Sequence, residues 1–297
     1  MIEGTRHYHP SGAAGPLRWA FLVTLLMFVA ELVGGLWTGS LALVSDALHM
    51  AVDLGALGLG LFAAWVSSRP PDDRRTFGYH RVEVLAALAN GVGLWILVGF
   101  ILREAFGRLR APHAVRVEPM LFIAVAGLLA NLVCGVILYR QSRKNINVRA
   151  AFLHVSSDAL GSVGAIAAGV IMWLTGWMLA DALASVFICV VIAVTSFQLV
   201  RDSIHILLEG TPEHVDLDAV RSALMEIEGV REVHDLHLWS LSSGSHSMTG
   251  HLLVDASVHS QDVIRRGAEL VEKRFGVDRV TLQIEAGRPV GTKSPTS

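Results

Sequence analysis

Two copies of the pattern His-x-x-x-Asp, His49–Asp53 and His154–Asp158, lie inside long apolar stretches of this chain. Residues four apart on an α-helix share one face, one turn above the other. Each copy would therefore present one imidazole and one carboxylate in the same direction. Two such faces turned toward each other would offer the two nitrogen and two oxygen ligands of a tetrahedral site, which is the geometry that zinc prefers. The alternative is a pair of buried polar contacts between helices.

The apolar surroundings favour the metal site over the polar contacts. An ionisable side chain at the centre of a bilayer costs about 2.5–3.5 kcal/mol on insertion scales, so four of them at identical spacing indicate a function. Asp46 precedes His49 by three residues and shares its face. Two interpretations stay open for Asp46: support of the site or a proton relay, or a polar residue near the start of a helix. Glu31, Asn90 and Asn131 are expected to face the helix bundle or a wet cavity.

Composition places the chain among membrane proteins. Hydrophobic residues make up 53% of its 297 residues and charged residues only 17%, with a mean hydropathy of +0.52. A membrane-spanning helix needs about 20 mostly apolar residues. Six segments qualify, at Leu17–Trp37, Leu41–Val66, Val82–Phe106, Met120–Tyr139, Ala150–Trp173 and Leu179–Val200. The two cysteines, Cys134 and Cys189, fall inside these segments and are interpreted as small buried apolar residues rather than a disulfide.

The distribution of Lys and Arg predicts the orientation in the membrane. Basic residues precede the first segment and follow the second and fourth, whereas the loops after the first and fifth segments have none. Because Lys and Arg favour the cytoplasmic side, both termini are expected in the cytoplasm. The loop after the third segment disagrees, since it carries four arginines: Arg103, Arg108, Arg110 and Arg116. Asp181 opens the sixth segment at a position where a helix N-cap is expected. Glycines in the second and fifth segments are expected to permit close approach of these two helices: Gly55, Gly58, Gly60, Gly161, Gly164 and Gly169.

The chain changes character after Arg201, and Gly210–Thr211–Pro212 marks the start of a soluble domain. Its hydrophobic spacing predicts helices at Asp216–Glu228 and Ser260–Phe275, and strands at Arg231–Ser240, Ser247–Ala256 and Arg279–Glu285. This order is typical of a small ferredoxin-like α+β domain. We therefore expect a cytoplasmic N-terminal segment at 1–16, six transmembrane helices at 17–209, a cytoplasmic ferredoxin-like domain at 210–286 and a disordered tail at 287–297. A domain of this size has a marginal core, which favours pairing with a second copy.

These features, taken together, resemble the cation diffusion facilitator (CDF) family, in its bacterial zinc-exporting branch. The resemblance covers the chain from about Leu17 to Glu285. It rests on four motifs: Ser40–Leu41–Ala42–Leu43 leading to His49 and Asp53, Thr76–Phe77–Gly78–Tyr79–His80–Arg81–Val82–Glu83, Asn147–Val148–Arg149–Ala150–Ala151 leading to His154 and Asp158, and Val233–His234–Asp235–Leu236–His237–Leu238–Trp239. The resemblance implies a metallochaperone-like soluble domain and a homodimer that exports divalent cations from the cytoplasm in exchange for protons. His49, Asp53, His154 and Asp158 would be the transport ligands.

The resemblance also implies secondary metal sites outside the membrane. His80 matches a histidine of a cytoplasmic-side site in vesicular relatives, to which Glu285 would contribute, although Asp278 replaces a histidine there. His234 and His251 resemble ligands of regulatory sites in the soluble domain. Other bacterial relatives use a site around Asp72, but Arg75 and Tyr79 stand where they have histidines, and the nearby arginines would repel a cation.

Strand pairing allows an independent test of His234 and His251. A hairpin turn centred on Ser243–Gly244 would place Leu236 opposite His251, so that His234 and His251 lie diagonally on one face of the sheet. Asp235 and His237 would then fall on the opposite face, although a one-residue shift in register would reverse this. The remaining histidines of the domain, His214, His246 and His259, are expected to be solvated.

Two imidazoles with two carboxylates favour Zn²⁺, with Cd²⁺ and Co²⁺ as further substrates. The expected function is therefore proton-coupled export of Zn²⁺ by a multi-pass protein of the bacterial inner membrane, with zinc as substrate and as a regulator, and with no nucleic-acid partner. The alternatives are an intramembrane zinc metalloenzyme and a membrane metal sensor. A catalytic zinc site usually keeps one position open, and no His-Glu-x-x-His pattern occurs here. No output module accompanies the soluble domain to support a sensor.

Overall fold

The computed structural model describes residues 14–142, 146–242 and 244–286. Contacts divide the chain into two compact units, one formed by residues 1–57 and 90–197 and the other by residues 58–89 and 198–297. The second unit contains the soluble domain. The tail at 287–297, which we expected to be disordered, lies outside the described residues, as does the N-terminal segment before residue 14.

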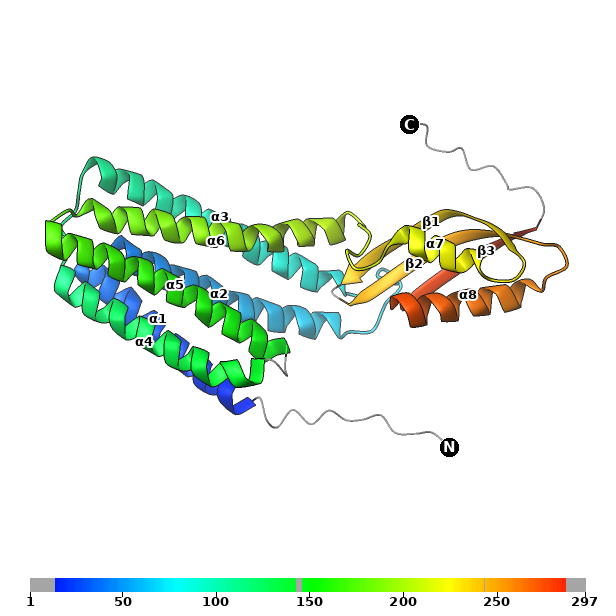
Figure 1. The fold of residues 1–297 in the computed structure, drawn as a ribbon, viewed down its shortest axis with the longest axis horizontal. Coiled ribbons are helices and arrows are strands. Elements are labelled where there is room, and N and C mark those ends of the chain that lie inside the picture. The colour runs from blue at the N-terminus through cyan, green and yellow to red at the C-terminus, as the bar shows by residue number, and fades with distance from the viewer. Residues whose placement is uncertain (1–13, 143–145, 243, 287–297) are drawn as a thin grey trace. The chain divides into compact units, whose positions relative to one another are not determined.

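Six long helices form the first part of the chain (Figure 1): α1 (Ala14–Thr38), α2 (Leu41–Ser67), α3 (Arg81–Arg110), α4 (Val117–Ser142), α5 (Ile146–Thr175) and α6 (Leu179–Leu207). Each contains a stretch that is long and apolar enough to cross a membrane, which confirms the six expected spans. Several helices run past the predicted ends. The 30 residues of α3 measure about 45 Å at 1.5 Å per residue, more than the roughly 30 Å of a hydrocarbon core, so polar ends project beyond it.

The helices pack through small residues and a few polar contacts. Helix α4 packs against both α1 and α5. Helices α3 and α6 run side by side (Figure 1). There the Trp95 indole N–H donates to Ser196 Oγ at 3.1 Å and the Trp95 ring stacks on Phe197. Both cysteines are buried and free, which confirms that they form no disulfide.

Asp181 joins α6 to the start of α2. Its carboxylate accepts hydrogen bonds from Ser40 Oγ and the backbone N–H of Leu41, both at 2.6 Å, and from the N–H of Ala42 at 3.3 Å. These are the free N–H groups at the positive end of the α2 dipole, where a carboxylate is most favourable. We expected Asp181 to cap its own helix. It lies in the first turn of α6 and caps α2 instead, a contact between residues 140 positions apart.

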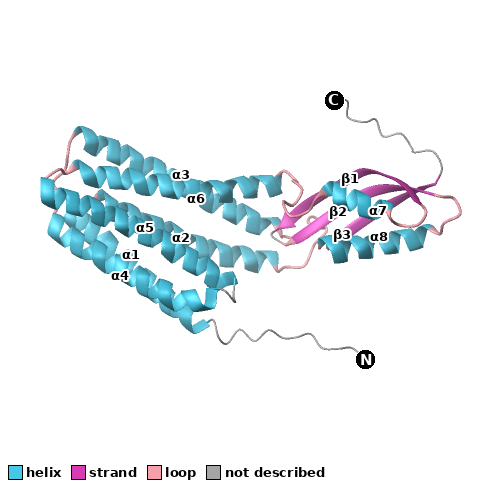
Figure 2. Ribbon diagram, viewed as in Figure 1, coloured by secondary structure: helices cyan, strands magenta, loops and turns pink. Residues whose placement is uncertain are grey.

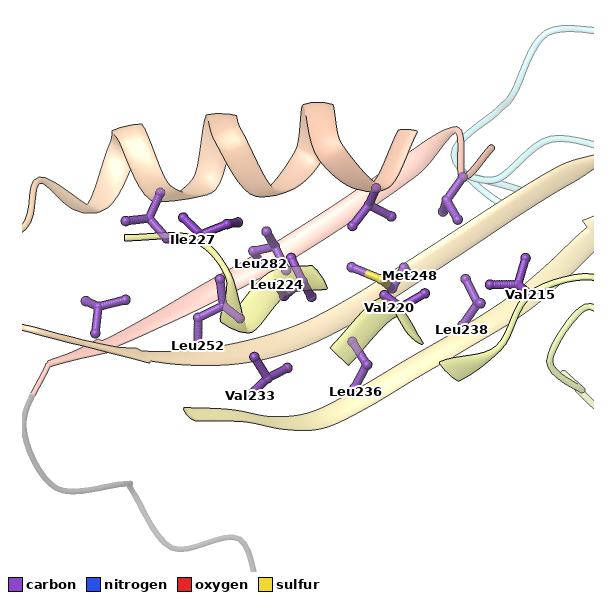
Figure 3. Packing of buried hydrophobic residues seen from close by; sticks show 14 residues of the cluster. Val215, Val220, Leu224, Ile227, Val233, Leu236, Leu238, Met248, Leu252 and Leu282 are labelled. Carbon is purple, nitrogen blue, oxygen red and sulfur yellow. The ribbon is translucent and has the colours of Figure 1, made fainter. Parts of the chain in front are cut away.

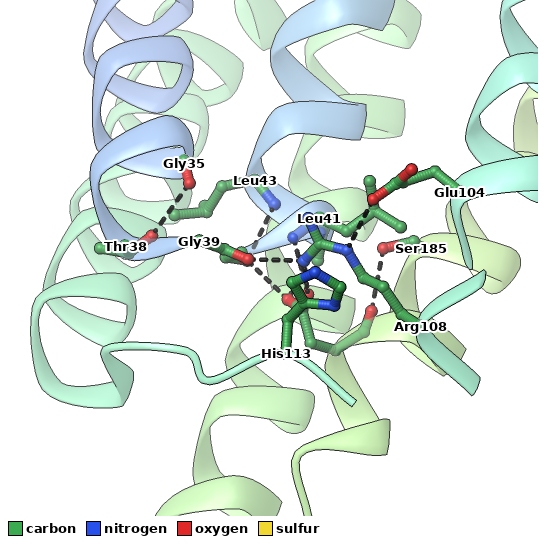
Figure 4. A network of polar contacts seen from close by, with 12 residues as sticks. Gly35, Thr38, Gly39, Leu41, Leu43, Glu104, Arg108, His113 and Ser185 are labelled. Atoms are coloured by element: carbon green, nitrogen blue, oxygen red, sulfur yellow. Dashed lines mark hydrogen bonds and ion pairs between the residues drawn. The ribbon is translucent and has the colours of Figure 1, made fainter. Parts of the chain in front are cut away.

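Arg108 neutralises Asp181 and holds the turn between α1 and α2 (Figure 4). Its guanidinium lies 3.5 Å from Asp181 Oδ2, donates to the carbonyl oxygen of Gly39 at 2.6 Å and donates to Glu104 Oε1 at 3.2 Å. Gly39 adopts a left-handed φ of 76°, which favours glycine. Arg108 therefore has a structural role.

The soluble domain contains two helices and three strands (Figure 2): α7 (Leu217–Met225), β1 (Val230–Ser242), β2 (Ser245–Val254), α8 (Ser260–Phe275) and β3 (Arg279–Ala286). Strand β2 lies in the centre of the sheet, antiparallel to β1 and parallel to β3. The α+β domain expected from the sequence is confirmed. Its helix α8 begins and ends at the predicted residues, and Gly276, with a left-handed φ of 68°, ends it.

The core of the soluble domain lies between one face of the sheet and the two helices (Figure 3). Val220 and Leu224 of α7 and Val263 and Val271 of α8 are fully buried. The core consists entirely of residues between 215 and 282, in particular Val215, Val220, Leu224, Ile227, Val233, Leu236, Leu238, Met248, Leu252, Val254, Val263, Val271, Val277 and Leu282. A self-contained core of this kind indicates that the domain can fold on its own.

The Asp181 contact generates a stability prediction. Asp181→Ala should lower the free energy of unfolding by about 3 kcal/mol, because it leaves the Arg108 charge and the N–H groups of α2 without their buried carboxylate. Thermal unfolding of the detergent-solubilised protein measures the change. Asp202→Ala, which removes an exposed carboxylate from the same helix, is the matched control and should change stability little. Equal stability of the two variants would contradict the structural role of Asp181.

Candidate metal sites

Helix α2 brings the first histidine–aspartate pair together. His49 Nε2 lies 3.5 Å from Asp53 Oδ2, and both side chains are largely buried. This is the i,i+4 contact that the sequence predicts, and it holds an imidazole nitrogen and a carboxylate oxygen on one side of the helix. The pair can supply two ligands of a metal ion without a change in the backbone.

Helix α5 carries the second pair. Asp158 is 3% exposed and lies within electrostatic range of Asp53 on α2. His154 lies in α5, one turn before Asp158, but its side chain lies outside the described part of the chain. One carboxylate of α2 and one of α5 thus lie within electrostatic range of each other inside an apolar bundle. Such an arrangement favours a cation between them.

The glycines of α2 and α5 differ in their surroundings. Among the described residues, no atom lies within 4 Å of where a Cβ at position 55, 58 or 60 of α2 would lie, so the expectation that these glycines bring α2 close to α5 stays a prediction. On α5, only Gly161 meets α2: a Cβ at this position would lie 2.9 Å from Asp46 Oδ1. Gly164 faces Phe187 of α6, and Gly169 faces Leu121 of α4. The helical period of the sequence does not tell which neighbouring helix a glycine faces. The role of the glycine depends on that neighbour.

A small cavity adjoins the α2 pair. It has a volume of about 20 Å³ and is lined by residues of α2, α5 and α6, among them Asp46, His49, Ser157 and Thr195. This volume is enough for about one water molecule, and the lining offers several polar partners for it. The side chain of Asp46 is itself buried. Asp46 therefore lies beside His49 with room for a proton-conducting contact, which favours support of the site over a role confined to the start of the helix.

A second group of metal-ligating side chains lies in the soluble domain. His234 Nε2 lies 3.2 Å from Glu285 Oε2, and His251 Nδ1 lies 2.9 Å from Glu285 Oε1. Ligand atoms of all three residues lie within 4.8 Å of one another. Because each histidine neighbours a core residue along its strand, the group lies on the sheet face opposite α7 and α8. Three of the four predicted secondary-site residues thus come together, and small rotations would bring them to zinc-binding distances.

The register of the hairpin differs from the prediction. His234 pairs directly with His251, whereas we expected Leu236 there. Two irregularities in β1 cause the shift: one lies between Ser240 and Ser242, and the other is a bulge between His234 and His237, where Asp235 has a left-handed φ of 50°. The two histidines still share a face, as predicted. Asp235 was expected on the opposite face, but the bulge turns its carboxylate to 3.7 Å from His251 Nε2 and 3.1 Å from His237 Nε2.

His246 is buried, which contradicts the expectation that it is solvated. Its Nδ1 lies 3.1 Å from Ser240 Oγ, and its ring lies 5.1 Å from that of His214, measured between centroids. Burial lowers the pKa of His246, and His214 adds to this effect while Asp278 partly opposes it. His214 and His259 are exposed, as expected. Asp278, which stands at a histidine position of relatives, accepts a hydrogen bond from the backbone N–H of His246 at 3.2 Å.

His80 does not belong to the group around Glu285. Its Nδ1 lies 3.5 Å from Ser67 Oγ at the end of α2. In the same loop, Asp72 accepts hydrogen bonds from the backbone N–H groups of Arg74 and Arg75 and from the Tyr79 hydroxyl, at 2.6–2.9 Å. The Tyr79 hydrogen bond lowers the pKa of Asp72. The carboxylate of Asp72 thus organises the loop.

Comparisons with known proteins agree with this architecture. A family model described as the cation efflux transmembrane domain matches residues 17–208, and one described as the cation efflux protein cytoplasmic domain matches residues 212–287. The first match alone covers more than half of the chain. The chain belongs to the cation diffusion facilitator family. The resemblance recognised from its motifs is confirmed.

Several relatives of this CDF protein are similar over most of their length. The metal cation efflux system protein CzcD of Cupriavidus metallidurans is 39% identical, over 96% of this chain and 90% of its own. The zinc transporter ZitB of Yersinia pestis is 42% identical, over 90% and 86% respectively. The cadmium, cobalt and zinc/H⁺-K⁺ antiporter of Bacillus subtilis is 37% identical, over 94% and 91%. This CDF protein is therefore a multi-pass membrane protein from a family of metal cation transporters.

One solved structure is also similar in sequence. The metal-bound C-terminal domain of the CzcD transporter from Cupriavidus metallidurans is 33% identical and covers 24% of this CDF chain and 99% of its own, with a TM-score of 0.23. At this score the likeness carries no structural argument.

The group around Glu285 generates a binding prediction. The isolated domain of residues 211–286 should bind Zn²⁺ and gain about 2.7 kcal/mol of stability at a hundredfold excess over Kd, because the ion binds only the folded state. The double variant His234→Ala/His251→Ala should lose this thermal shift. His259→Ala, which removes an exposed histidine, is the control. Undiminished zinc binding by the double variant in isothermal titration would disprove the assignment.

Proposed function

We propose that this protein exports Zn²⁺ from the cytoplasm in exchange for protons, with Cd²⁺ and Co²⁺ as further substrates. The observation that carries the proposal is the His49–Asp53 contact on α2 together with the repeat of the same pattern at His154–Asp158 on α5. The four residues would bind the ion between the two helices. The similarity to relatives named as zinc, cadmium and cobalt transporters supports this substrate class.

The ligand types support zinc as the preferred ion. Imidazole nitrogen suits zinc and its neighbours, whereas an all-oxygen site would suit manganese or magnesium. Four protein ligands would satisfy a tetrahedral ion completely. A site filled in this way holds its ion for transport, whereas hydrolytic catalysis needs a bound water at an open position, so we favour a transporter over the metalloenzyme.

Competition between metal and protons supplies the exchange mechanism. A histidine must lose its proton to bind a metal, so metal binding releases protons and protonation releases the metal. In an alternating-access cycle, cytoplasmic Zn²⁺ would displace protons from the inward-facing site, and protons from outside would displace Zn²⁺ after the helices rock outward. The membrane potential contributes about 2.3 kcal/mol per charge per 100 mV to such a cycle.

We place the protein in the bacterial inner membrane as a homodimer with both termini in the cytoplasm. Arg6 and Arg18 near the N-terminus and the basic residues around the loops after α2 and α4 support this orientation. Arg108, one of the four arginines on the other side, is held by Asp181 and Glu104. In the cytoplasm, the group around Glu285 would sense zinc and regulate transport.

The aspartates of the transport site provide the first test. Asp53→Ala or Asp158→Ala should reduce zinc flux into proteoliposomes with an imposed pH gradient to the level of empty vesicles, because either change removes a ligand of the ion. Glu118→Ala, which removes an exposed acid at the start of α4, should transport normally. Near-normal flux in either aspartate variant, in protein that folds and dimerises, would refute the proposed site.

The histidines provide a test of metal choice. His49→Asp should shift the preference away from zinc and toward manganese, because it replaces a nitrogen ligand by an oxygen ligand. Competitive flux of zinc, cadmium and manganese through the same vesicles measures the preference. If the order of preference is unchanged, selectivity is set by other residues.

A further inference from the structure

Glu31 of α1 is an acid buried in the membrane-spanning bundle that the transport site does not use. It is 2% exposed, and its Oε2 atom has no hydrogen-bond partner among the described residues. A polar atom in such a place costs free energy unless something binds it. Ser162 of α5 is equally buried, and its hydroxyl also has no partner among the described residues. Two polar groups from different helices are thus directed into one region of an apolar bundle.

Two glycines make the space for this region. A Cβ at position 127 of α4 would lie 2.6 Å from Glu31 Oε1 and 3.6 Å from Ser162 Oγ. A Cβ at position 161 of α5 would lie 2.9 Å from Asp46 Oδ1. Distances below 3 Å are shorter than van der Waals contact, so a side chain at either position would displace a carboxyl group. The sequence therefore leaves room for two buried carboxyl groups beside the proposed transport site.

Among the described residues, the two charged groups that act on Glu31 are both acids. Asp46 of α2 and Asp158 of α5 lie within electrostatic range, and Asp46 is also buried. Helix α4, which packs against α1, presents Gly127 and the uncharged, buried Asn131. His49 and Asp53 follow Asp46 along α2. In a medium of low dielectric constant, three carboxylates without a cation would repel one another strongly.

From this geometry we infer that Glu31 is a proton-binding site separate from the four proposed metal ligands, and that its proton is exchanged when the metal ion binds. The inference deepens the proposed function and rests on it. A metal ion at Glu31 would need about four ligands. Among the described residues, the groups beside positions 127 and 161 supply fewer, namely the carboxyl groups of Glu31 and Asp46 and the Ser162 hydroxyl, whereas a proton needs only one carboxyl group and an acceptor.

The exchange follows from electrostatics. When Zn²⁺ binds beside Asp158, its two positive charges favour the ionised form of Glu31, whose carboxyl group then releases its proton to water. When the metal leaves, Glu31 takes up a proton again from the side to which the site is open. The cavity beside Asp46 and His49, which has room for about one water molecule, offers a path between this region and the metal ligands. The region loses the single charge of the proton as it gains the two charges of the metal ion. The buried acids therefore always have a cation beside them, which limits the repulsion between them.

The test counts protons on metal binding and follows the coupling of flux to pH. Zn²⁺ is added to the purified full-length protein in a weak buffer containing a pH indicator, and the protons released per bound zinc are measured. Glu31→Gln should release about one proton fewer per zinc than the unchanged protein. In proteoliposomes, the same variant should show a smaller acceleration of zinc flux by a pH gradient. Ser196→Ala, which removes a buried hydroxyl from α6, is the control and should behave like the unchanged protein.

Two further variants keep the test decisive if Glu31→Gln folds poorly. Glu31→Asp keeps a carboxyl group and should restore most of the proton release. Gly127→Ala leaves the acid in the sequence but displaces its carboxyl group, and should weaken the coupling of flux to pH.

Unchanged proton release and pH dependence in both Glu31→Gln and Gly127→Ala would overturn the inference. Loss of a bound zinc ion in Glu31→Gln, with four ligands intact, would make Glu31 a metal ligand and also overturn it. Absence of zinc flux in the unchanged protein would instead refute the proposed function.

Discussion

The cost of placing charge in an apolar medium is the constraint on which the rest of this structure depends. Asp181 meets it by capping the free N–H groups of α2 and by pairing with Arg108, so that one carboxylate joins α2, α3 and α6 (Figure 4). Glu31 and Asp46, deeper in the bundle, form no such ion pair with an arginine or lysine among the described residues. For Glu31 and Asp46, the space comes from Gly127 and Gly161 instead. This difference separates a structural carboxylate from carboxylates that can exchange a cation.

Two candidate metal-binding groups in this protein combine imidazole with carboxylate side chains, but different elements bring their residues together. On α2, the pair is set by one turn of helix, and the contact between His49 and Asp53 needs no other element. In the soluble domain, the group depends on three strands: β1 and β2 provide one histidine each, and Glu285 of β3 contacts both rings. The first group therefore depends only on the spacing of two residues in one helix, whereas the second depends on the register of three paired strands. A proton or a metal ion can act on either, because imidazole and carboxylate ligands bind both.

Several sequence-based predictions failed where the outcome depends on a neighbour that the sequence does not reveal. The register of β1 and β2 shifted because β1 is irregular between Ser240 and Ser242 and bulges at Asp235, and one extra residue at such a place leaves no clear mark in the hydrophobic pattern. His246 was expected in water but packs beside Ser240 and His214. Gly164 and Gly169 of α5 were expected to meet α2 but face Phe187 of α6 and Leu121 of α4. In each case the local pattern was interpreted correctly, but the residue that makes the contact from another part of the chain was not predicted.

The sequence by itself determined the class of the protein: six membrane-spanning helices, a helix–strand–strand–helix–strand domain and two His-x-x-x-Asp faces. These features depend on composition and on periods of 3.6 and 2 residues, which are local properties of the chain. Only the tertiary structure decided that Asp181 caps α2, that Glu31 and Asp46 occupy the space beside two glycines, and that Glu285 joins His234 to His251. Each of these contacts joins residues distant in the sequence, and their geometry depends on how whole helices and strands pack.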